Sequence, residues 1–206
     1  MKYSRFSIFL VLAALIAVPP FAVAQGDDDR LAIETATGQT IVRPVGDYLW
    51  KPARDGLVLG AGDRVRVRSG DAQVELPQAD LLVMGDGEFE ILCSLVGGVL
   101  QPWTNDIQLY IGSYELTFRD NASRPGLTAY TLFAEMASSD ARVDVLETAK
   151  GTRVTVREGA IRIRHRNESG AVPKVLREGE TAWFGSRDIR VGPTAHIATI
   201  GEALAR

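Results

Sequence analysis

Two short runs of alternating arginine and aliphatic residues are the part of this sequence best suited to recognise another molecule. The first is Arg64-Val65-Arg66-Val67-Arg68, and the second is Ile161-Arg162-Ile163-Arg164-His165-Arg166. In a β-strand, alternate side chains lie on one face about 7 Å apart, so each run predicts a row of three guanidinium groups. Guanidinium groups bind carboxylates and phosphates through paired hydrogen bonds. The six arginines are therefore candidate ligand-binding residues.

Two interpretations of these rows remain open at the level of sequence. In the first, the arginines lie on a solvated outer face and pair with Glu75, Glu88 or Asp144 on neighbouring strands, where each pair contributes little to stability. In the second, they bind an anionic envelope polymer or an acidic protein. The chain has a net charge of −3, so bulk composition does not explain the clusters. Trp103 is a further candidate recognition residue on a loop, with burial as the alternative.

The residues that catalysis or metal binding require are scarce. His165 and His196 are the only histidines, and neither has a second histidine or a cysteine at ligand spacing. Ser94 does not stand in a G-x-S-x-G motif, and Gly97-Gly98 is not followed by the lysine of a phosphate-binding loop. The sequence therefore predicts a protein that is not an enzyme, with no catalytic residue, metal or cofactor.

The first 24 residues have the organisation of a secretory signal peptide. Lys2 and Arg5 precede an apolar run, and Ala22-Val23-Ala24 forms a small-x-small cleavage site. An uncleaved membrane anchor is the weaker alternative, because Pro19-Pro20 interrupts the apolar run. Cleavage removes two positive charges and changes the net charge from −3 to −5, which argues against nucleic acid as a partner. We expect a periplasmic or secreted protein that meets the membrane only through this segment before cleavage.

Beyond a polar, acidic leader over residues 25–29, the hydrophobic pattern mostly repeats every two residues, which is typical of strands. We expect hairpins that join residues 64–68 to 73–76, 80–84 to 88–92, 108–111 to 114–118, and 142–147 to 153–156. Residues 127–137 fit a short helix or a strand, and we favour the strand. Short strands with glycine-centred turns predict an all-β fold, an antiparallel β-roll or sandwich with room for one short helix.

One phrase occurs twice, more than a hundred residues apart. Val58-Leu59-Gly60-Ala61-Gly62-Asp63 is repeated in outline by Val175-Leu176-Arg177-Glu178-Gly179-Glu180. Each phrase places a glycine where a tight turn needs positive φ, and each precedes a predicted strand. The repetition predicts two similar turns.

The segment around the first phrase resembles the FecR-type sensor domain of bacterial periplasmic proteins. The resemblance is carried by Trp50, Ala53, Gly56, Leu57-x-Leu59, Gly62-Asp63-x-Val65-x-Val67, Ala72 and Val74-Glu75-Leu76. Residues 148–163 and 176–180 are similar to the closing segments of that domain. Val67 departs from the threonine usual in the family, and Pro77-Gln78-Ala79-Asp80 replaces its usual turn. Residues 93–128 resemble either an insertion or a rewritten stretch of the domain.

The resemblance implies an exported module that binds an envelope protein or an anionic polysaccharide. The alternative is a structural or assembly factor of a cell-envelope or surface complex. The expected organisation is a signal peptide over residues 1–24, a leader and first segment over 25–44, a FecR-like β domain over 45–192, and a C-terminal tail over 193–206.

Overall fold

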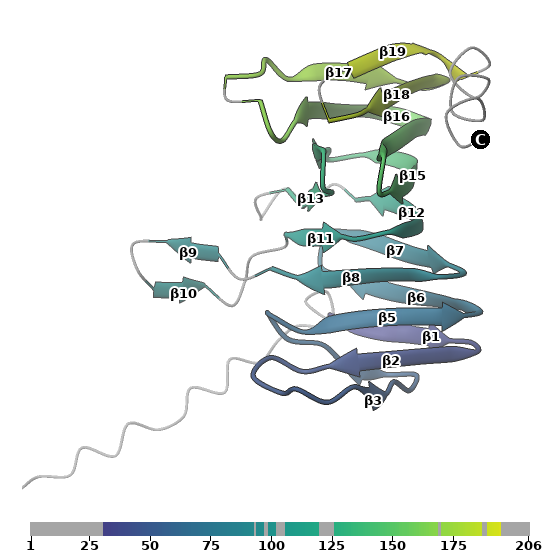
Figure 1. Cartoon of the computed structure of the whole chain (residues 1–206), viewed down its shortest axis with the longest axis vertical. Helices are drawn as coiled ribbons and strands as arrows, with labels where there is room; N and C mark the ends of the chain where they lie inside the picture. The colour runs from purple at the N-terminus through teal and green to yellow at the C-terminus, as the bar shows by residue number, and fades with distance from the viewer. Residues whose placement is uncertain are drawn as a thin grey trace, which may run out of the picture.

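The described part of the chain is built from strands that stack along one long axis (Figure 1). The structure is a computed structural model and describes residues 31–92, 94–96, 99–101, 106–119, 126–168, 170–186 and 189–194. Hydrogen bonding sorts the strands into two long sheets, here sheet A and sheet B, which pack face to face. The all-β fold predicted from the sequence is confirmed, and it is a sandwich.

Sheet A is antiparallel throughout. Its strands, in spatial order, are β4 (Leu57–Val58), β1 (Ala32–Ala36), β6 (Asp71–Leu76), β7 (Ala79–Met84), β12 (Gly112–Phe118), β15 (Ala141–Thr148), the first half of β16 (Gly151–His165), β18 (Glu180–Phe184) and β19 (Ile189–Pro193).

Sheet B contains one parallel pair, β11 with β13. Its strands, in spatial order, are β3 (Lys51–Pro52), β2 (Gln39–Arg43), β5 (Arg64–Ser69), β8 (Gly87–Ile91), β11 (Ile107–Leu109), β13 (Thr128–Tyr130), β14 (Ala134–Ala137), the second half of β16 and β17 (Lys174–Arg177). The strands β9 (Ser94–Val96) and β10 (Val99–Gln101) form a separate hairpin beside the sandwich (Figure 1).

Most glycine turns carry the chain from one sheet to the other rather than back along the same sheet. Three of the predicted hairpins are therefore wrong: β5 and β6, β7 and β8, and β11 and β12 lie in different sheets. At Gly70, for example, φ is 75°, and an added Cβ would lie 2.6 Å from the Thr37 carbonyl oxygen, because the corner packs closely against the turn before β2. Only the hairpin of β15 with β16 is confirmed.

Strand β16 belongs to both sheets. Its first half pairs with β15 and β18, and its second half pairs with β14 and β17. The change of sheet coincides with a register shift opposite Arg142 and Val143, and with Gly159 at φ 75°. A bulge with a glycine in the left-handed region bends a strand without breaking it.

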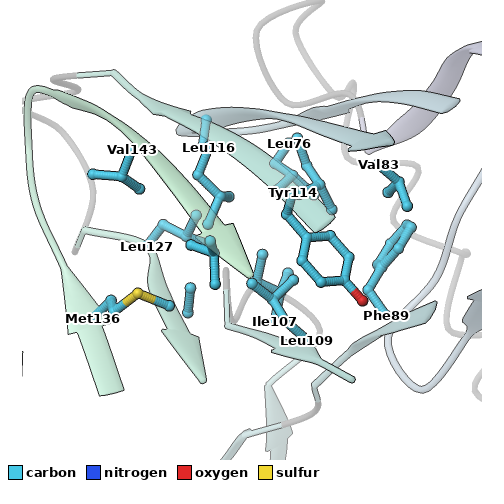
Figure 2. Packing of buried hydrophobic residues seen from close by; sticks show 14 of the residues in the cluster. Leu76, Val83, Phe89, Ile107, Leu109, Tyr114, Leu116, Leu127, Met136 and Val143 are labelled. Atoms are coloured by element: carbon cyan, nitrogen blue, oxygen red, sulfur yellow. The ribbon is translucent and has the colours of Figure 1, made fainter. Parts of the chain in front are cut away.

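The core lies between the sheets and is made of the inward side chains of both. Figure 2 shows aliphatic and aromatic side chains from several strands, including Phe89, Leu116 and Met136, meeting in one cluster. Burial of such apolar surface is the main favourable term in folding. Tyr114 is the largest of the fully buried side chains, and its hydroxyl group lies at the edge of the cluster near Phe89.

The sandwich begins earlier than the sequence predicts. Strands β1 and β2 pair with β6 and β5, so the start expected at residue 45 falls inside the two sheets. Residues 127–137, for which helix and strand were both considered, contain the strands β13 and β14 and no helix. No helix in the described ranges is long and apolar enough to cross a membrane. The predicted signal peptide and most of the predicted tail lie outside these ranges.

The repeated phrase forms two equivalent turns between the sheets. The N–H of Gly60 donates to Asp63 Oδ2 at 2.8 Å, and the N–H of Arg177 donates to Glu180 Oε2 at 2.7 Å. A glycine with positive φ directly precedes each carboxylate, at 89° and 78°. In both turns, the carboxylate therefore accepts a hydrogen bond from the backbone N–H of the residue three positions earlier.

Gly159→Ala should destabilise the fold, because an added Cβ would lie 2.5 Å from the Asp140 carbonyl oxygen at a φ that alanine rarely adopts. The expected loss is of order 1–3 kcal/mol in the free energy of unfolding, measured by urea denaturation. Gly60→Ala is the control, since its Cβ would meet only Asp63 Oδ2 at 3.7 Å. Equal loss in both variants would contradict the role given to the bend.

Candidate ligand-binding site

The outer face of sheet B concentrates positive charge. We call it the arginine face. The strands of sheet B project seven arginines and three glutamates from it, a net charge of +4 on a protein whose sequence carries −3. These residues are Arg43, Arg64, Arg66, Arg68, Arg162, Arg164 and Arg177 with Glu88, Glu90 and Glu135. Asymmetric charge of this kind attracts ligands of opposite sign.

A single row of polar side chains crosses this face at right angles to the strands. Strand register places its seven members on consecutive strands, in the order Arg43, Arg64, Glu90, Gln108, Tyr130, Glu135 and Arg164. Neighbouring strands lie about 4.8 Å apart, so the row extends over about 29 Å. An extended ligand along it would meet a polar group at every strand.

Glu88 organises one end of the arginine face. It is buried on the outer side of β8, and its two carboxylate oxygens pair with the Nε atoms of Arg64 and Arg66. The Arg66 guanidinium lies 4.7 Å from the ring centroid of Trp50, and the Arg64 guanidinium lies 4.1 Å from that of Tyr110. One carboxylate therefore holds two arginines, each over an aromatic ring.

Tyr110 is fixed by its neighbours as well. Its hydroxyl donates to Glu90 Oε2 at 2.8 Å, and partial burial raises its pKa to about 12, so it remains a donor across the physiological range. From the core side, the Tyr114 hydroxyl lies 2.8 Å from the Tyr110 carbonyl oxygen and accepts from the Glu88 N–H at 3.0 Å. A core side chain thus anchors the backbone beneath this part of the face.

Arg166 lies in the turn after β16 and reaches across three strands. Its Nη1 donates to Gln108 Oε1 and, at 2.8 Å, to the Thr131 carbonyl oxygen. Its guanidinium carbon lies 5.2 Å from the ring centroid of Tyr130. Gln108 Nε2 in turn donates to the Tyr130 carbonyl oxygen at 3.2 Å, so the middle of the row is also held in place.

A groove of about 650 Å³ opens between the arginine face and the turns that follow β7 and β15. The size is that of a typical small-ligand pocket. The residues that define it here are Arg64, Arg66, Arg166, Glu147, Ile111 and Leu132. Ile111 and Leu132 are 64% and 55% exposed, so the groove offers two open aliphatic side chains beside three guanidinium groups.

Glu147 is the unusual member of the groove. The residue is 2% exposed, and its Oε2 accepts from the Thr152 hydroxyl, which lies 2.7 Å from that of Thr131. Its Oε1 is shielded from solvent. Burial raises the pKa of Glu147 from 4.5 to about 7, while hydrogen bonds from the Thr152 hydroxyl, the Leu132 N–H and the Thr131 hydroxyl act in the opposite direction.

The structure brings both predicted arginine rows onto one face, which the sequence did not predict. Arg64, Arg66 and Arg166 line the groove, while Arg68, Arg162 and Arg164 lie on the same face beyond it. The pairing interpretation is confirmed for Glu88, whereas Asp144 pairs with Arg157 on the opposite outer face. Arg164 pairs instead with Glu135, at 2.5 Å. Trp103 lies outside the described residues.

Sequence reasoning missed Glu147, Gln108 and Tyr110. For Glu147 a signal was available, because it shares the parity of Val143 and Val145 and therefore points inward from β15. A carboxylate at a core-facing position is rare unless it has a role. Gln108 and Tyr110 carried no such signal, since their importance depends on Arg64 and Arg166, which are distant in sequence.

His165 is held in place by hydrogen bonds at both ring nitrogens. It is buried; Asn167 N–H donates to its Nδ1 at 3.1 Å, and its Nε2 therefore donates to the Gly185 carbonyl oxygen at 2.8 Å. Among the described residues, no three His, Cys, Asp or Glu side chains are grouped so that they could hold a metal ion.

Comparison with known proteins gives similarity at the level of structure only. No protein-family profile matches the sequence, and no curated protein matches it significantly. Two crystal structures described as a "putative anti-sigma factor" from Parabacteroides distasonis align with TM-scores of 0.48 and 0.47, at 11% and 12% identity. The alignments cover 63% and 62% of this chain, and the chain spans only 60% and 59% of those structures.

Glu147→Gln should change how stability depends on pH. In the folded protein Glu147 holds its proton up to about pH 7, whereas the unfolded chain releases it near 4.5, so the free energy of unfolding falls as pH rises through this interval. In the parent, the free energy of unfolding should fall by about 1–3 kcal/mol between about pH 5 and about pH 8, and this fall should be absent in the variant.

Urea denaturation of the parent and the variant at both pH values measures this difference. Glu115→Gln provides the control, because Glu115 is a carboxylate paired with Arg142 on the outer face of sheet A. An identical pH dependence in the parent and in Glu147→Gln would show that the buried carboxyl does not hold a proton near neutrality.

Proposed function

We propose that this chain is an exported, non-catalytic binding module whose arginine face binds an extended anionic partner in the cell envelope. The observation that carries the proposal is the net charge of +4 on one outer face of a protein that is acidic as a whole. The resemblance to FecR-type sensor domains, and the secretory organisation of residues 1–24, point to the same kind of protein.

The arrangement of the arginines favours binding over surface solvation. Glu88 and the rings of Trp50 and Tyr110 hold two guanidinium groups in place before a ligand arrives, which lowers the entropy cost of binding. Arginines outnumber their carboxylate partners on this face, so donors remain to meet carboxylate or phosphate groups. The flat row of about 29 Å suits a ligand that lies across the strands.

The opposite outer face serves as the natural comparison. There Arg142 pairs with Glu115 at 2.9 Å and with Glu158 at 3.5 Å, and Arg157 pairs with Asp144. Arg142 matches Arg164 of sheet B in exposure and in pairing with a glutamate, but it belongs to the opposite outer face. Binding driven by the arginine face should therefore be insensitive to Arg142.

Arg164→Glu should weaken binding of polyglutamate or polygalacturonate about tenfold or more, because one charge-assisted contact is lost and a repulsive one is gained. Arg142→Glu is the matched control: the side chains are 48% and 45% exposed, and each pairs with a glutamate on a neighbouring strand. Titration calorimetry at low and at physiological ionic strength measures both variants. Equal affinities in the two variants, or no binding of either polymer to the parent, would reject the proposal.

A further inference from the structure

The groove beside the arginine face has a buried carboxyl group in its lining. Glu147 is bound within the protein by the Thr152 hydroxyl, and hydrogen bonds from the Leu132 N–H and the Thr131 hydroxyl also lower its pKa. The surface that a ligand can reach is therefore formed by the arginines and the exposed aliphatic side chains of the groove.

The groove also leaves apolar surface uncovered. Ile111 follows β11, where the chain crosses to sheet A, and Leu132 lies in the turn that joins β13 to β14 within sheet B. Both side chains are more than half exposed. Each residue lines the groove. Two aliphatic side chains beside a hollow form an apolar subsite, and its natural occupant is an aliphatic group.

The aromatic rings of the arginine face favour a peptide over a carbohydrate. A sugar ring is best recognised by an open aromatic face, whereas Trp50, Tyr110 and Tyr130 each have a guanidinium group over the ring at 4.1 to 5.4 Å. Guanidinium groups so placed present their N–H edges to carboxylates. Carboxylates next to an aliphatic group and an N–H donor are what an acidic peptide provides.

We propose that the groove anchors an acidic peptide segment of a partner protein, and that an aliphatic side chain of this segment packs between Ile111 and Leu132. Carboxylates on either side of the aliphatic residue bind Arg64, Arg66 and Arg166, which line the same groove. This inference rests on the proposed function, because it names the class of ligand that the arginine face receives.

The test uses three anionic probes and the full chain exported by its own N-terminal segment. The first probe is a short peptide of glutamate and aspartate with one central leucine, blocked at both ends. The second is the same peptide with serine for leucine, and the third is polygalacturonate of similar charge. We expect the leucine peptide to bind about tenfold more tightly than the serine peptide, as burial of one leucine side chain allows.

Leu132→Ser should abolish this tenfold preference, and Ile111→Ser should do the same. Both side chains are exposed, so the variants are expected to fold. Val175→Ser is the matched control, because Val175 is 58% exposed on the arginine face and is not among the residues that line the groove. It should retain the preference for leucine.

The possible outcomes separate this inference from the proposed function. Equal binding of the two peptides, binding of polygalacturonate alone, or equal effects of Leu132→Ser and Val175→Ser would overturn the peptide groove and leave the arginine face as an anion-binding surface. Failure of all three probes to bind would overturn both proposals. A leucine preference lost only in the groove variants would support both.

Discussion

Burial of two inner faces against each other governs nearly everything else in this molecule. Side chains in a strand alternate between faces, so each aliphatic residue committed to the core sends its neighbours outward. Val65 and Val67 are fully buried, and the arginines between and beside them therefore line the outer surface of β5. The same holds for Ile161 and Ile163 in β16. The arginine face is in this sense a direct product of the hydrophobic pattern.

The sequence allowed the strands and the orientation of the arginines to be predicted, because both depend on a local period of two. It did not allow the pairing of strands to be predicted. A glycine such as Gly70, with φ 75°, suits a hairpin turn and a corner between sheets equally well, and only the packing around it decides between them. For that reason the two arginine rows, almost a hundred residues apart, could not be assigned to one face in advance.

The candidate site shows the same division between local and long-range information. Arg64 and Arg66 stood out from the sequence, and Glu88 was among the partners considered for them. The aromatic rings beneath the guanidinium groups, and the reach of Arg166 to Gln108, depend on contacts between strands that are distant in the chain. Prediction of charge was possible, but prediction of how that charge is held in place was not.

The shared strand β16 has a mechanical consequence. Because one continuous backbone of 15 residues is hydrogen-bonded first into sheet A and then into sheet B, the sheets cannot slide past each other at this level without breaking both ladders. Elsewhere they are joined by corners and by contacts between apolar side chains, which resist shear less well. A force applied to the arginine face near Arg164 would therefore be transmitted along the backbone of β16 into sheet A.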